Sequence, residues 1–144
     1  MTITRRQTLI AAAGTLCALL APAVRAQATP ATQKAVFQVS DADPGKWNLA
    51  LNNVRNVQDD LGAEATELEI VVYGPGIGML KADSPVAARV AAALKAGVKV
   101  VACENTMKAQ KLTYADMLPA IGYVQAGVTE LMKKQREGWA YIRP

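Results

Sequence analysis

The feature that most constrains the fold is a regular alternation of strand-like and helix-like segments. Runs rich in β-branched residues and ended by turn residues are typical of strands, and apolar residues at helical spacing lie between them. The predicted strands cover residues 34–41, 67–74, 98–103, 121–127 and 139–144. The predicted helices cover residues 44–61, 84–96, 106–118 and 128–138. We therefore expect a flavodoxin-like three-layer α/β sandwich, with about five mostly parallel strands and helices on both faces.

Three loops follow the carboxyl ends of the first three predicted strands, and they read SDADP, GPGIGML and CENTM. The third strand, residues 98–103, is almost wholly apolar, which predicts a central strand covered on both faces. Ligands and catalytic groups of open parallel sheets gather beyond the carboxyl ends of the strands. If the three strands are neighbours, their loops share one end of the sheet and form the site there.

The first 28 residues differ in kind from the rest, because they contain three arginines and no acid. An interrupted apolar run, too short for the roughly 20 residues of a membrane anchor, leads to the small-x-small pattern of a signal-peptide cleavage site. We expect residues 1–28 to be a cleavable signal peptide, 29–33 a short linker and 34–144 one domain of a periplasmic protein. The stretch TRRQTLI resembles a twin-arginine export signal, and the general secretion route is the alternative.

Charge and residue types exclude several classes of function. The chain has 16 basic and 12 acidic residues, and three of the basic residues belong to the leader, which leaves 13 against 12. That balance gives no reason to expect nucleic acid or a membrane surface as a partner. The chain has no histidine, and the predicted mature chain has one cysteine, which excludes histidine-based catalysis and thiolate metal cages. We therefore expect neither a metal nor a cofactor.

Cys103, at the end of the third predicted strand, is the cysteine that remains after removal of the leader. An odd cysteine in an exported protein indicates a reactive or intermolecular thiol. The start of the next helix, which Asn105 or Thr106 is predicted to cap, would stabilise a thiolate, whereas Glu104 would oppose it. The sign of the change in the thiol pKa therefore stays open. A small buried side chain without chemistry is the alternative.

The glycine-rich loop after the second predicted strand places Gly74, Gly76 and Gly78 close together. Glycine lets bare backbone approach a ligand, or here the Cys103 loop. The spacing matches neither the dinucleotide fingerprint nor the P-loop, so a phosphate or nucleotide site ranks last. A tight turn that requires positive φ angles is the favoured alternative.

Polar residues around the first predicted helix have ordinary explanations. Asn48, Asn52 and Asn56 lie four apart on one face, which favours a solvated face over a contact with another subunit or with the facing loops. Asp41 and Asp43 suit turn formation and helix capping better than general acid–base catalysis.

Four segments, VFQVSDADPGKWNLALNNVRN, VVYGPGIGML, VVACENTM and GWAYIRP, resemble the DsrE/DsrF-like family, most of all a branch with a strand-end cysteine in a C-x-N-T motif. The resemblance implies a flavodoxin-like fold and homo-oligomers, commonly trimers or hexamers. In the sulfur-relay members of the family a cysteine carries sulfur as a persulfide, and those members act in the cytoplasm. Export is therefore a departure from the family pattern.

Two hypotheses of function follow. In the first, an exported sulfur-handling protein carries sulfane sulfur as a persulfide on Cys103, the catalytic residue, and exchanges it with a small sulfur compound or a partner protein. The side chains of Asn105 and Thr106 and the loop of residues 74–78 would then bind the charged sulfur. In the second, the protein is a non-catalytic, homo-oligomeric binding or assembly module in which Cys103 is buried and inert.

Overall fold

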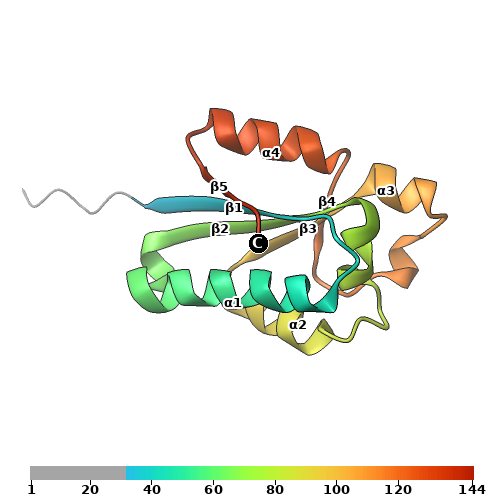
Figure 1. Cartoon of the computed structure of the whole chain (residues 1–144), viewed down its shortest axis with the longest axis horizontal. Helices are drawn as coiled ribbons and strands as arrows, with labels where there is room; N and C mark the ends of the chain where they lie inside the picture. Colours follow the sequence, from blue (N-terminus) through green and yellow to red (C-terminus); the bar gives the residue numbers. More distant parts are fainter. Residues whose placement is uncertain (1–31) are drawn as a thin grey trace, which may run out of the picture.

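The computed structural model describes residues 32–144, which form one five-stranded sheet between layers of helices (Figure 1). The strands are β1 (Gln33–Val39), β2 (Thr66–Val72), β3 (Lys99–Cys103), β4 (Gly122–Val124) and β5 (Ala140–Ile142). Every pairing is parallel, in the order β4-β3-β2-β1-β5. The predicted flavodoxin-like α/β sandwich is confirmed, and β3 is an interior strand between β2 and β4 with four of its five residues buried.

The helices divide unequally between the two faces of the sheet. Figure 1 shows α1 (Pro44–Leu61) and α2 (Ala87–Lys95) on one face, and α4 (Gly127–Arg136) on the other. The short α3 (Glu104–Ala109) follows β3 directly. Asp43 caps α1 as predicted, because its side chain accepts a hydrogen bond from the Gly45 amide at 2.8 Å.

The hydrophobic core is likewise larger on one face of the sheet than on the other. Side chains of successive strand residues point to opposite faces, so each strand contributes to two clusters. The cluster under α1 and α2 is large and includes Phe37, Ile70, Met79 and Leu80. The buried part of the cluster under α4 has five members, which are Val36, Val71, Val101, Leu131 and Trp139. The single helix α4 is therefore held by far fewer apolar contacts than the pair on the opposite face.

Two segments, one predicted as a loop and one predicted as a helix, differ from the sequence-based expectation. The segment GPGIGML forms a 3₁₀ helix, η2 (Gly74–Leu80), and the helix predicted over 106–118 is wrong in both bounds. It begins at Glu104 with Cys103 at the N-cap position, so neither Asn105 nor Thr106 caps it. It ends early because Lys111 adopts a left-handed backbone conformation, with φ of 56°. Two further 3₁₀ turns are η1 (Ala63–Ala65) and η3 (Tyr114–Asp116).

The asparagine face of α1 is not simply solvated. The Arg89 guanidinium of α2 donates hydrogen bonds to the side-chain oxygens of Asn48 and Asn52, which joins the two helices. The predicted solvated face holds for Asn52 and Asn56, which are exposed, whereas Asn48 is partly buried. A long arginine on the neighbouring helix reaches the first two asparagines.

The predicted signal peptide, residues 1–28, lies outside the described residues, as does most of the predicted linker. Gln33, expected to end that linker, is already the first residue of β1. In the described part of the chain, no helix combines the length and apolar character needed to cross a membrane.

Candidate functional site

The loops beyond β1, β2 and β3 meet at one end of the sheet, as predicted. The Gly76 amide donates to the Ser40 carbonyl at 3.1 Å, which joins the second loop to the first. The Gly74 amide donates to the Thr106 hydroxyl oxygen at 2.9 Å, and the Gln110 side chain donates to the Gly74 carbonyl at 3.3 Å. The second loop therefore supports the start of α3, where Cys103 lies.

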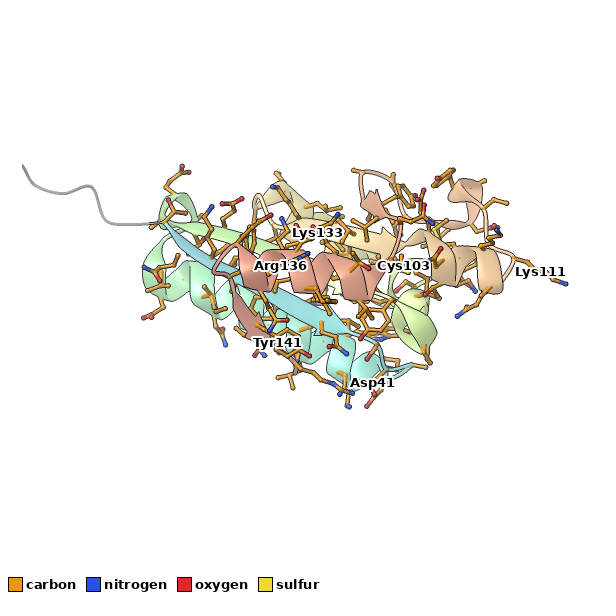
Figure 2. All side chains as sticks on the ribbon, turned by 90° about the horizontal axis from the view of Figure 1, so that it is seen from above. Asp41, Cys103, Lys111, Lys133, Arg136 and Tyr141 are labelled. Atoms are coloured by element: carbon orange, nitrogen blue, oxygen red, sulfur yellow. The ribbon has the colours of Figure 1, made fainter. Side chains whose placement is uncertain are left out.

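Cys103 lies between the starts of two helices. Figure 2 shows it beside the amino-terminal end of α4, and in the chain it directly precedes α3. The residue is 5% exposed. Its thiol, when protonated, donates to the Gln125 carbonyl oxygen, 3.9 Å from the sulfur. The sulfur is thus close to the surface but largely covered by protein.

Four groups that can donate a hydrogen bond to the Cys103 thiolate act on its sulfur and lower its pKa. They are the Thr106 hydroxyl and the backbone N–H groups of Gly127, Thr106 and Asn105. Asn105 and Thr106 belong to the first turn of α3, and Gly127 is the first residue of α4. Amides at a helix start have no acceptor within the helix and are free to stabilise an anion. We call this set of four donors the thiolate nest.

The nest decides the ionisation of the thiol. Burial by itself raises the pKa of Cys103, because the thiolate loses its hydrating water. The Thr106 hydroxyl acts against burial, followed by the amides of Gly127, Thr106 and Asn105, and together they bring the pKa below its ordinary value. Glu104, expected to oppose the thiolate, accepts a hydrogen bond from the Tyr114 hydroxyl. The sequence did not fix the sign of the change in the thiol pKa. In the structure the pKa is lowered, which favours the thiolate.

The three glycines of the second loop have different roles. Gly74 has a φ of 55° and reaches the site through its amide, which bonds Thr106. A Cβ on Gly76 would lie 2.7 Å from the Val39 carbonyl oxygen, and one on Gly78 would lie 3.1 Å from the Trp47 ring. Gly76 and Gly78 therefore let the loop pack tightly against β1 and α1. The structure brings only Gly74 into contact with the nest.

Asn105 contributes its backbone and not its side chain. Its amide donates to the Gln125 carbonyl at 3.2 Å, and the same amide makes the smallest of the four contributions that lower the pKa of Cys103. Its side-chain oxygen accepts a hydrogen bond from the Gln125 side chain at 2.8 Å, at the surface. Thr106, in contrast, uses both its amide and its hydroxyl on the sulfur.

Sequence reasoning missed Gly127, because residues 121–127 were assigned to a strand. The glycine is buried, and a Cβ in its place would lie 2.9 Å from the Tyr73 ring. A glycine directly before the last predicted helix was the signal that could have indicated a close approach. Gln125, which touches the sulfur only through its carbonyl group, gave no signal.

The acids of the first loop are engaged in structural contacts. Asp41 pairs with Lys46 at 3.1 Å and with Arg143 at 3.7 Å, and Asp43 caps α1. Among residues 32–144, no group of three or more histidine, cysteine, aspartate or glutamate side chains is arranged to hold a metal ion.

Distant likenesses agree with this fold. The structure is similar to a conserved protein of unknown function from Bacteroides thetaiotaomicron (13% identity, 81% of this chain and 99% of that chain, TM-score 0.65). It is also similar to the ychN protein of E. coli (12% identity, 78% and 99%, TM-score 0.61). No match was found among curated proteins.

A nearer likeness and a family model carry more weight. A protein of unknown function from Methanobacterium thermoautotrophicum is 36% identical, over 78% of this chain and 99% of that chain, with a TM-score of 0.74. The model of the DsrE/DsrF-like family matches residues 33–144. Because that match covers almost every residue described here, including both helix starts around Cys103, the chain belongs to the DsrE/DsrF-like family.

Proposed function

We propose that this protein handles sulfur, and that Cys103 accepts a sulfane sulfur as a persulfide and passes it on. One observation carries the proposal: a hydroxyl and three amides converge on the Cys103 sulfur and favour its anionic form. Membership of the DsrE/DsrF-like family supports it, since the family suggests a fold related to sulfur relay.

The chemistry requires only a thiolate and a sulfur donor. The thiolate attacks the sulfane sulfur of a polysulfide or of thiosulfate, and a new S–S bond forms on Cys103. The S–S bond of the donor breaks, and its electron pair leaves with a shorter polysulfide or with sulfite. A second thiolate then attacks the outer sulfur of the persulfide and restores the Cys103 thiolate. No external oxidant or reductant is consumed.

The surroundings of Cys103 suit this exchange. A thiolate that is already formed needs no histidine base, and the chain contains none. With Cys103 only 5% exposed, a bound persulfide would be shielded from oxidants that convert cysteine sulfur to acids. Because so little of Cys103 is exposed, the sulfur donor must be a small sulfur compound or a partner protein with a narrow segment that reaches the thiolate.

The proposal also includes the cellular location and the oligomeric state of the protein. The composition of residues 1–28 supports export to the periplasm, with the twin-arginine pair as the routing signal. The family supports a homo-oligomer, a trimer or a hexamer. The sulfur is then exchanged outside the cytoplasm.

Mass spectrometry of the intact protein tests the persulfide. The chain carries Cys17→Ser, so that Cys103 is its one thiol, and is incubated with polysulfide or thiosulfate. We expect a mass gain of one sulfur atom that maps to Cys103 and disappears with dithiothreitol. The matched control adds Cys103→Ser and should gain nothing. No gain on the folded protein, or an equal gain in the control, would count against the proposal.

The low exposure of Cys103 favours a second candidate, a non-catalytic homo-oligomeric module with an inert thiol. A thiol reagent separates the two. Labelling of Cys103 in the native protein supports the sulfur carrier, whereas labelling only after denaturation supports the module.

A further inference from the structure

Helix α4 supplies one donor of the thiolate nest, yet few apolar side chains hold it on the sheet. Of its ten residues, Gly127 and Leu131 are buried. Val128 and Met132 point outward and are 53% and 54% exposed. A surface helix is normally held by a broad apolar stripe. The position of α4 therefore depends on other contacts.

The third sheet-facing residue of α4 is a lysine in a mostly buried charge cluster. Lys134 Nζ lies 3.1 Å from Glu69 Oε2 and 3.6 Å from Glu130 Oε1. It also lies 4.3 Å from the centre of the Trp139 ring. The Lys134 side chain is 13% exposed and that of Glu69 is 4% exposed. The pair is thus shielded from solvent and much less screened than a surface ion pair.

Glu69 is an unusual residue for the middle strand of the sheet. Its neighbours in β2, from Leu68 to Val72, are apolar and buried. Its Oε1 has no hydrogen-bond partner within residues 32–144. Burial raises its pKa, and Lys134 opposes that effect. A buried ion pair with an unsatisfied oxygen is often less stabilising than apolar packing, so stability alone gives little reason for its presence.

Gly127, Leu131 and Lys134 lie at positions i, i+4 and i+7 and share one face of α4. Gly127 packs on Tyr73, Leu131 enters the small core cluster, and Lys134 reaches Glu69. Three contacts along one line fix both the rotation and the height of the helix. The ion pair lies two turns along α4 from Gly127, so it restrains the tilt of the helix axis on the sheet.

We propose that Glu69 and Lys134 are positioning residues, which hold α4 in the register that keeps the Gly127 N–H on the Cys103 sulfur. The inference deepens the proposed function and rests on the same thiolate nest. The two residues would thus influence the ionisation of Cys103 without belonging to the nest. Besides Lys134, the charged groups that act on Glu69 are Glu130 of α4 and Lys99 of β3.

The test measures the pH dependence of Cys103 alkylation by iodoacetamide in the Cys17→Ser chain. In Lys134→Met and in Glu69→Gln we expect the thiol pKa to rise, so that alkylation at neutral pH slows by up to about tenfold. Amide hydrogen exchange at residues 127–130 should become faster, and Lys134→Arg, which keeps the charge, should restore most of the rate. The control is Lys34→Met. Lys34 lies 5.7 Å from the same Trp139 ring but pairs with Glu67, at 2.8 Å, so its loss should leave the profile unchanged.

Folded Lys134→Met and Glu69→Gln proteins with the wild-type pH profile would overturn the inference, even if both are less stable. If neither variant folds, Glu130→Gln removes the longer contact to Lys134 together with the exposed pair to Lys133. A small rise of the thiol pKa is then expected, whereas no rise contradicts the inference. Because alkylation involves no sulfur donor, this result is independent of persulfide formation. The positioning role and the sulfur-carrier role can therefore fail separately.

Discussion

Thr106→Val is expected to slow the alkylation of Cys103 at neutral pH by about tenfold or more. The Thr106 hydroxyl is the largest of the influences that lower the thiol pKa. A hydrogen bond to a charged group contributes about 1.5–3 kcal/mol, which corresponds to roughly one to two pKa units. Valine keeps the shape of threonine but cannot donate. It also leaves the Gly74 amide without its acceptor, so the free energy of unfolding should fall by about 1–3 kcal/mol.

The pH profile of alkylation in the Cys17→Ser chain measures this effect, and the control is Thr113→Val. The Thr113 hydroxyl bonds Asp116 at 2.8 Å in the cap of η3, away from the thiol. That variant should lose stability without moving the thiol pKa. An unchanged profile in Thr106→Val, or equal shifts in the two variants, would refute the role given to the hydroxyl.

Gly76→Ala should be the most destabilising change to the loops. The new Cβ would lie 2.7 Å from the Val39 carbonyl oxygen and 3.0 Å from the Ser40 Cα. Both are backbone atoms, so no side chain can turn aside and the two loops must separate. Such overpacking costs about 1–3 kcal/mol and occasionally more. We also expect a higher pKa for Cys103, because the Gly74 amide that supports Thr106 would move with the loop.

Urea unfolding compares Gly76→Ala with Gly45→Ala. In the control, the nearest atom to the new Cβ is a side-chain oxygen of Asp43, at 3.1 Å, near the exposed start of α1. Its unfolding midpoint should stay close to that of the wild type. Equal unfolding midpoints for the two variants would show that the close approach of Gly76 to Val39 does not affect the stability of the protein.

The general architecture could be predicted because it depends on local patterns. The β-branched runs and the helical spacing identified the five strands, and the rule for parallel sheets placed three loops at one end. The cap by Asp43 was also local, since a capping side chain acts within its own turn. The strand order and the early end of α3 at Ala109 depend on tertiary contacts and conformational choices that the pattern does not encode.

The candidate site was predictable only in part. Cys103 and Thr106 lie within one short segment, so their association could be expected. The Gly127 amide comes from another helix, and its approach depends on how α4 packs on Tyr73. Glu69 follows the alternation of polar and apolar residues in ELEIVV and looks like a solvent-facing position. Only the packing of α4 over β2 shows that its carboxylate is buried.

The ionisation of Cys103 also affects stability. Its pKa in the folded protein is lowered, so the resulting stabilisation is fully present above the pKa of the unfolded thiol. It is lost as the pH falls through the lower pKa of the folded thiol. The same hydrogen bonds that prepare the nucleophile thus favour the folded state.

The most direct test of this account is the ionisation midpoint of Cys103, followed by the ultraviolet absorbance of the thiolate in the Cys17→Ser chain. The measurement compares the native protein with the same chain unfolded in urea. The thiolate nest predicts that the native midpoint lies at a lower pH than the unfolded one. A native midpoint equal to or above that of the unfolded chain would mean that burial outweighs the four donors, and it would contradict the proposal that this fold prepares Cys103 as a thiolate.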